Sequence, residues 1–153
     1  MNSLDFNTLL DLPDTVVEKT ELNKEHEFLV HVKSILEGTT CHCCGQHTNK
    51  PYGFDKEQRI RHLSVFGYPC YIVIKLPRYQ CYCKKKIVTT TQRLSWRTKN
   101  SSYTTAFEKH ILLSLINSTI EDISTKESLG YGAIEGIIER NTAGEVDWDG
   151  ITD

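Results

Sequence analysis

Four cysteines in two closely spaced pairs are the residues most able to do chemistry in this 153-residue chain. Cys41 and Cys44 form a Cys-x-x-Cys pair followed by Gly45, whereas a single residue separates Cys81 from Cys83. Zinc prefers four soft ligands in a tetrahedron, and two short turns that give two thiolates each supply this set. The glycine lets the backbone turn back so that amide groups face the sulfur atoms. The spacing predicts one structural Zn²⁺ held by these four cysteines.

Neighbouring side chains leave the exact ligand set open. Cys43 is adjacent to Cys44 and could replace it, and His42 or His47 could supply a nitrogen ligand. The sixth cysteine, Cys70, alternates within an apolar run and is interpreted as a small buried hydrophobic residue. We expect no catalysis at these thiols, because four protein ligands leave no open coordination position and the sequence places no base beside a thiol.

The compartment follows from what the sequence lacks. No stretch reaches the roughly 18 to 20 consecutive apolar residues of a membrane span. Residues 1–12 also lack the basic flank and apolar centre of a secretory signal. We therefore expect a cytoplasmic protein without membrane contact, in a reducing compartment where paired cysteines bind metal rather than form disulfides.

The net charge of −2 hides a strong asymmetry along the chain. Residues 41–99 hold twelve basic and two acidic side chains, whereas residues 1–40 and 100–153 are acidic. From residue 75 to residue 99 there are eight Lys or Arg and no Asp or Glu. A segment of one sign in a nearly neutral chain is typical of a surface that binds phosphate, although a solvated surface is the alternative. The candidate DNA contacts are Arg59, Arg61, Arg78, Lys84, Lys85, Lys86, Arg93, Arg97, Lys99 and Arg140.

The elements that must position the cysteines are expected to be strands. Residues 27–34 alternate in hydrophobicity, and residues 59–66 and 70–76 are rich in β-branched and aromatic residues, with a turn at 67–69. The run at 70–76 continues directly into Cys81. The order strand, cysteine pair, hairpin, cysteine pair predicts a zinc ribbon in which this hairpin delivers ligands. The polar stretch between the two cysteine pairs contains Pro51 and Gly53 and is expected to be a loop.

After residue 95 the pattern becomes helical. Apolar residues recur at helical spacing between 102 and 117, where Ser101 or Ser102 could cap the start. A short second helix would begin after Ser118 or Thr119, and a third would span 131–140. Ser124 and Ser128 occupy the small-residue position and the turn position of a helix-turn-helix motif, and residues 131–140 would be its recognition helix. The alternative is a helical hairpin that only buries its isoleucines.

The fold class predicted is therefore α+β, with a small β-rich zinc-ribbon domain followed by a helical helix-turn-helix domain. The domains are expected at 1–95, including an N-terminal extension, and at 96–141. Residues 142–153 are acidic and are expected to be a linker.

The ordered set of motifs resembles the N-terminal part of bacterial insertion-sequence transposases of the ISL-three family. The motifs are Leu-Leu-Asp-Leu-Pro at 9–13, Cys-His-Cys-Cys-Gly at 41–45, Gly-Tyr-Pro-Cys-Tyr-Ile-Val-Ile at 67–74, Arg-Tyr-Gln-Cys-Tyr-Cys at 78–83 and Arg-Thr at 97–98. The tail Val-Asp-Trp-Asp at 146–149 is similar to the segment that precedes the catalytic domain of that family.

The resemblance implies a zinc-binding and helix-turn-helix region that recognises the terminal inverted repeats of the element for DNA transposition. The RNase H-like domain, with its acidic metal-binding residues, would follow these residues, so we expect no catalytic residue in this chain. The expected partner is double-stranded DNA at insertion-sequence ends. The alternatives are a zinc-stabilised module for self-association, which would make a homodimer, and a truncated transposase that acts as a DNA-binding regulator.

Overall fold

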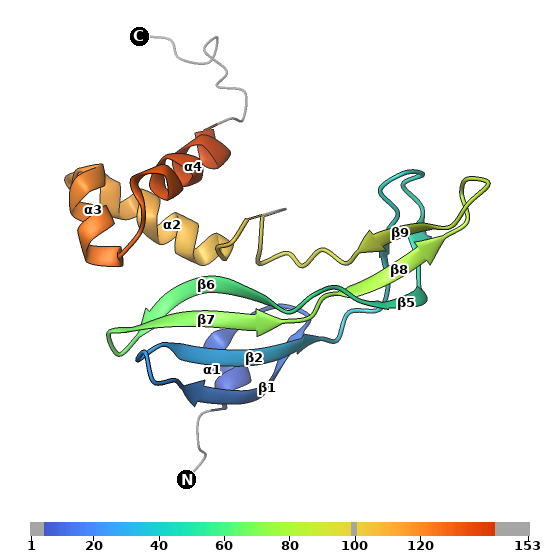
Figure 1. Cartoon of the computed structure of the whole chain (residues 1–153), viewed down its shortest axis with the longest axis horizontal. Coiled ribbons are helices and arrows are strands. Elements are labelled where there is room, and N and C mark those ends of the chain that lie inside the picture. The colour runs from blue at the N-terminus through green and yellow to red at the C-terminus, as the bar shows by residue number, and fades with distance from the viewer. Residues whose placement is uncertain (1–4, 99–100, 143–153) are drawn as a thin grey trace. The chain divides into compact units, whose positions relative to one another are not determined.

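The computed structural model describes residues 5–98 and 101–142 (Figure 1). The chain divides into two compact units, Met1–Thr105 and Ala106–Asp153. The first is rich in strands and the second is helical, so the predicted α+β class is confirmed. Lys99 and residues 143–153 of the predicted linker lie outside the described residues. Within the described part, no helix is long and apolar enough to cross a membrane.

A four-stranded sheet contains the hydrophobic core of the first unit. It is built from β1 (Thr15–Leu22), β2 (Phe28–Ser34), β7 (Tyr68–Ile74) and β6 (Gln58–Val65), in that spatial order. β2 and β7 are parallel, and the other neighbouring pairs are antiparallel. The core side chains of β2 and β7 fall at every second position, as expected when one face is packed. The buried cluster comprises Val30, Val32, Ile60, Cys70, Ile72, Ile74, Leu76, Leu94 and Trp96.

The zinc ribbon is a separate, smaller group of strands. β5 (Lys50–Phe54), β8 (Pro77–Cys81) and β9 (Val88–Thr91) form an antiparallel sheet in the order β5-β8-β9. β3 (Thr39–Thr40) pairs with β4 (His47–Thr48) around the first cysteine pair. The predicted strands at 27–34, 59–66 and 70–76 exist, but their assignment to the ribbon was wrong. The hairpin β6–β7 belongs to the four-stranded sheet, because its alternating isoleucines and valines pack into that core.

Buried polar contacts join the two sheets of the first unit. The side chain of Gln92, which follows β9, is 1% exposed. It accepts a hydrogen bond from Ser34 Oγ at the end of β2 (2.5 Å) and donates to the carbonyls of Leu36 and Gly38 (both 2.8 Å), just before β3. These bonds fix the chain as it leaves the four-stranded sheet and enters the ribbon.

Short helices complete the chain. α1 (Phe6–Leu10) lies in the first unit. The second unit contains α2 (Thr105–Ser114), the 3₁₀ helix η1 (Leu115–Asn117), α3 (Ile120–Glu127) and α4 (Tyr131–Thr142). α2 begins at Thr105, so the prediction that Ser101 or Ser102 caps it was wrong. The three predicted helical segments are otherwise confirmed.

Local chemistry explains where α3 begins and ends. The Thr119 side chain accepts a hydrogen bond from the backbone N–H of Asp122, whose carboxylate accepts one from the backbone N–H of Thr119. This reciprocal capping box satisfies two of the donors that a helix start leaves free. At the other end, Ser128 adopts a left-handed conformation (φ 54°) that ends the helix.

Candidate metal centre

The four predicted ligand sulfurs come together at one place. The Sγ atoms of Cys41, Cys44, Cys81 and Cys83 all lie within 4.8 Å of one another. Cys41 Sγ is 3.8 Å from Cys83 Sγ, and Cys44 Sγ is 3.7 Å from Cys81 Sγ. A tetrahedron with zinc–sulfur bonds of about 2.3 Å has edges of about 3.8 Å, which these separations match. They are far longer than the roughly 2.05 Å of a disulfide bond.

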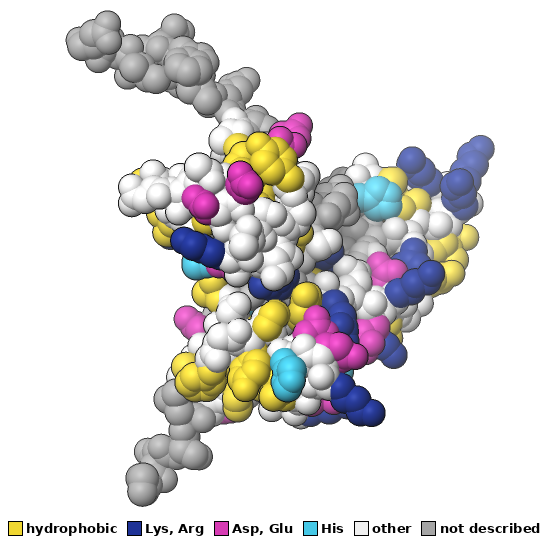
Figure 2. Space-filling model, turned by 60° about the vertical axis from the view of Figure 1, so that its left-hand side comes forward, with side chains coloured by type: hydrophobic (Ala, Val, Ile, Leu, Met, Phe, Trp, Pro, Cys, Tyr) yellow, Lys and Arg dark blue, Asp and Glu magenta, His cyan; other side chains and the backbone are white. Residues whose placement is uncertain are grey.

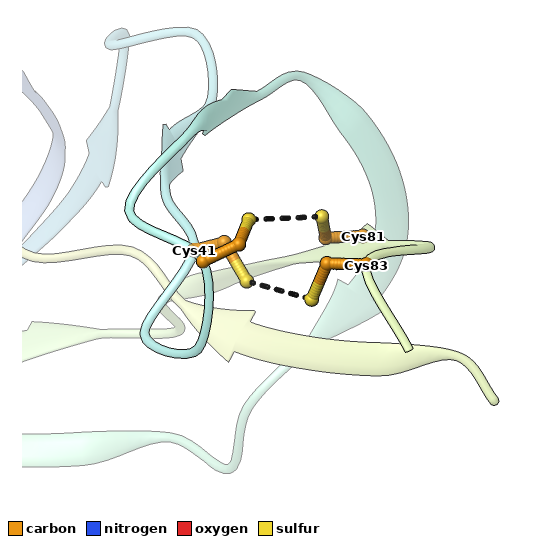
Figure 3. Close-up of side chains that lie close together, drawn as sticks. Cys41, Cys81 and Cys83 are labelled. Atoms are coloured by element: carbon orange, nitrogen blue, oxygen red, sulfur yellow. Dashed lines mark hydrogen bonds between the residues drawn. The ribbon is translucent and has the colours of Figure 1, made fainter. Parts of the chain in front are cut away.

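Two hairpins deliver the sulfurs from opposite directions (Figure 3). Cys41 follows β3 directly, and Cys44 lies in the turn before β4. Gly45, at φ 73°, reverses the chain in this turn and donates its N–H to the Cys41 carbonyl at 2.9 Å. Cys81 is the last residue of β8, and Cys83 lies in the turn that leads to β9.

The electrostatics of the four thiols favour a bound cation. Backbone N–H groups of Cys44 and Cys43 lower the pKa of Cys41 to about 6, which favours its thiolate form. Desolvation, reinforced by a hydrogen bond with Cys41, raises the pKa of Cys83 to about 12. The pKa of Cys81 is raised as well, first by desolvation. A divalent cation relieves this conflict, because it stabilises all four sulfurs as thiolates.

The structure separates the ligands from their alternatives. Cys43 is exposed and lies outside the sulfur cluster. The Nδ1 atom of His42 lies 2.7 Å from the hydroxyl of Thr90, and neither His42 nor His47 belongs to the cluster. Cys70 is fully buried in the four-stranded sheet, where desolvation raises its pKa to about 11, as its interpretation as a core residue requires. Among the residues that the structure describes, Cys41, Cys44, Cys81 and Cys83 form the one such cluster.

Fold and site together define a zinc ribbon with one structural Zn²⁺ held by four cysteines. A family model described as the zinc-finger of transposase IS204/IS1001/IS1096/IS1165 matches residues 37–83, which contain all four ligands. Residues 37–83 are thus similar to the zinc-finger region of these transposases. Comparisons with curated proteins and with solved structures give no significant match.

The predicted DNA contacts of the first unit differ in accessibility. Lys84, Lys85, Lys86 and Arg93 are exposed, the three lysines directly after the last zinc ligand. In the space-filling view, Lys and Arg side chains gather at the upper right with few Asp or Glu side chains among them (Figure 2). Arg59 is exposed and lies 3.4 Å from Glu27.

Two other predicted contacts of the first unit are engaged with protein groups. Arg61 is 6% exposed, and its guanidinium lies 5.7 Å from the centre of the Tyr71 ring. Little of this side chain is therefore accessible to a phosphate. Arg97 is half-buried and donates from Nε to the Ser101 carbonyl at 2.7 Å; burial lowers its pKa.

Arg140, in the helical unit, donates two hydrogen bonds to a single carboxylate oxygen of buried Glu108, at 2.8 and 2.6 Å. This ion pair offsets much of the positive charge that α4 could present to a phosphate.

Arg78 and Tyr52 form a contact that the sequence did not indicate. Tyr52 lies on β5, in the stretch expected to be a loop, and the Arg78 guanidinium of β8 is 5.8 Å from its ring centre. The signal was present as two aromatic residues, Tyr52 and Phe54, at strand spacing. Pro51 and Gly53 concealed it, because both residues are rare inside strands.

Proposed function

We propose that this chain is the DNA-binding region of an insertion-sequence transposase and that it recognises the terminal inverted repeats of its element. The observation that carries the proposal is the position of the exposed Lys84–Lys86 cluster, directly after the last cysteine of a transposase-type zinc ribbon. The metal holds the turn that bears these lysines, so their charges are presented at a fixed place. Lys and Arg side chains on such a surface neutralise phosphates and release counterions from DNA.

The helical unit would contribute a helix-turn-helix formed by α3 and α4. Residues 128–130 join the two helices, which is the turn length typical of this motif. Ser124 supports the turn, because its hydroxyl donates to the Leu129 carbonyl at 2.5 Å. With Arg140 bonded to Glu108, we infer that the ribbon supplies most of the electrostatic attraction. Strand cleavage is proposed to lie outside these residues, and the cell compartment to be the bacterial cytoplasm.

A mobility-shift titration with insertion-sequence end DNA tests this proposal. The variant Lys84→Gln/Lys85→Gln/Lys86→Gln should weaken binding and reduce the slope of log affinity against log salt concentration by about 3, because each lysine contacts one phosphate. The matched control Lys19→Gln/Lys24→Gln/Lys33→Gln removes the same charge from exposed positions on the four-stranded sheet and should leave that slope unchanged. Equal effects of the two triple variants would contradict the proposal.

Self-association is the second candidate, favoured by the surface of the helical unit. Leu113 and Ile116 are exposed there, at 57% and 70%. Both belong to residues 100–153, a part of the sequence rich in acidic residues. If this unit mediates a homodimer, light scattering will show twice the monomer mass with or without DNA, and Ile116→Glu will restore the monomer. A monomeric wild-type chain at high concentration would remove this candidate.

A further inference from the structure

The β5 strand of the ribbon is exposed along its whole length. All five of its residues are exposed, including Tyr52 at 54% and Phe54 at 69%. Exposed aromatic rings on an edge strand lower solubility and promote pairing with strands of other chains. Here they contribute to no hydrophobic core. Their presence on the surface of a metal-held region therefore calls for a ligand.

Each strand of the ribbon sheet contributes to the face that carries Tyr52. The Arg78 guanidinium on β8 lies 5.8 Å from the Tyr52 ring centre and donates from Nη2 to Thr89 Oγ1 on β9 at 2.5 Å. Thr91 is directly opposite Arg78 in the register, so it lies on the same face. The result is an aromatic ring with a positioned cation beside it and hydroxyl groups next to that cation. Among the described residues, Arg78 forms no ion pair with a carboxylate.

A cavity of about 320 Å³ lies beside the β9 part of this face, without Tyr52 or Arg78 in its lining. Thr89 and Thr91 line it, and Arg93 and Arg97 line it as well. Its apolar lining comes from Ile60, Leu76, Leu94 and Trp96. The lining includes one carboxylate, Asp55, which accepts a hydrogen bond from the Thr91 hydroxyl at 3.1 Å. The cavity thus combines apolar surface with cations, the combination that a base and its phosphate require.

We propose that this face of the β5-β8-β9 sheet binds an unpaired stretch of DNA, with a base stacked on Tyr52 and its neighbouring phosphates near Arg78 and Lys84–Lys86. In a duplex the faces of the bases are already stacked on one another, so only an unpaired base can use an exposed ring. The charge is complementary, because no Asp or Glu occurs from Leu76 to Thr98. This inference rests on the proposed DNA-binding function and adds to it a preference for unpaired bases at the ribbon.

Fluorescence anisotropy with the full chain tests the inference, using a short single-stranded oligothymidylate and an insertion-sequence end duplex as probes. Tyr52→Leu should weaken binding of the single strand about tenfold, since stacking on one aromatic side chain accounts for an effect of this size. Binding of the duplex should stay unchanged. Tyr52→Phe keeps the ring and should bind the single strand like the wild type. Phe66→Leu is the matched control, because Phe66 is 96% exposed in the turn between β6 and β7, outside the ribbon sheet and the helix pair.

The outcomes separate this inference from the proposed function. If Tyr52→Leu weakens both probes equally, or weakens neither, base stacking on Tyr52 is wrong while DNA binding stands. If the wild type binds the duplex but not oligothymidylate at low salt, the inference is likewise overturned alone. If the wild type binds neither probe, both proposals fail. Zinc content equal to that of the wild type shows that each variant has kept the ribbon folded.

Discussion

The strands of the four-stranded sheet and of the zinc ribbon alternate along the chain, but the two regions are stabilised differently. In the sheet, Val30, Ile60 and Ile72 are almost completely buried, and each such side chain contributes roughly 1.5–3 kcal/mol through burial. In the ribbon sheet, β5 buries nothing, and Tyr79 is the principal buried apolar side chain of β8. The ribbon has four converging sulfurs in place of a hydrophobic core.

This difference determines which region is free to bind charged ligands. A strand that contributes to a hydrophobic core must place an apolar residue at every second position. A strand held by metal ligands is released from that requirement, so the ribbon can carry lysines, arginines and exposed aromatic rings. The same chain thereby separates stability in the four-stranded sheet from the proposed DNA recognition by the ribbon.

Loss of one zinc ligand should have the largest effect and should fall on the ribbon alone. Cys44→Ser removes one of the four sulfurs, and structural zinc contributes on the order of 10 kcal/mol to the folding of small zinc domains. We expect the zinc content of the purified protein to fall well below one ion per chain. Hydrogen exchange should show loss of amide protection in β5, β8 and β9, with protection kept in β2 and β7.

Cys43→Ser is the matched control for this experiment, because Cys43 lies in the same turn but outside the sulfur cluster. It should retain one zinc ion per chain. If Cys44→Ser loses amide protection in both sheets, the four-stranded sheet depends on the ribbon. That result would contradict the conclusion that the two regions are stabilised independently.

A cavity in the hydrophobic core should destabilise the four-stranded sheet without releasing zinc. Ile72→Ala removes a fully buried side chain and should lower the free energy of unfolding by about 2–5 kcal/mol. Denaturant unfolding of the zinc-loaded protein measures this change. Ile35→Ala, at a residue that is 58% exposed, should change the free energy by less than about 0.5 kcal/mol. Similar losses for the two variants would argue against a core at this sheet.

Acidification should affect the sheet through His62, by a smaller amount. Burial lowers the pKa of His62 from its usual 6.5, while its Nδ1 lies 2.8 Å from the Thr104 hydroxyl. The unfolded state then binds the proton more readily, so the stabilisation is complete above pH 6.5 and is lost as the pH falls toward the lower folded pKa. Between pH 7.5 and 5.5, the wild type should lose more free energy of unfolding than His62→Gln. Parallel curves for the two proteins would exclude His62 as the cause.

Much of the local structure could be predicted from the sequence. The alternation in residues 27–34 predicted a strand because a half-buried strand repeats every two residues. The β-branched and aromatic residues at 70–76 predicted another, because such side chains pack well on a sheet. Thr119 and Ile120 marked the start of a helix because a threonine cap needs only its immediate neighbours. The spacing of the cysteines predicted the four ligands that the structure brings together.

Contacts between distant residues could not be predicted in this way. The hairpin β6–β7 has the strand pattern of either sheet, and only its packing against β2 decides that it is not part of the ribbon. β1 was missed because its eight residues alternate weakly and lie at the edge of the sheet. Arg61 was predicted from the sequence to be an exposed DNA contact, yet the fold buries it.

For this protein, the sequence alone determined the zinc chemistry, the acid-free basic segment and the positions of most strands and helices. These features depend on residue type and on short spacings, which the chain carries by itself. The tertiary structure decided which sheet each strand joins, why Cys43 is excluded from the metal site, and which cations stay accessible. Those properties depend on pairing between segments that are 30 or more residues apart, such as Glu108 with Arg140 and Cys41 with Cys83.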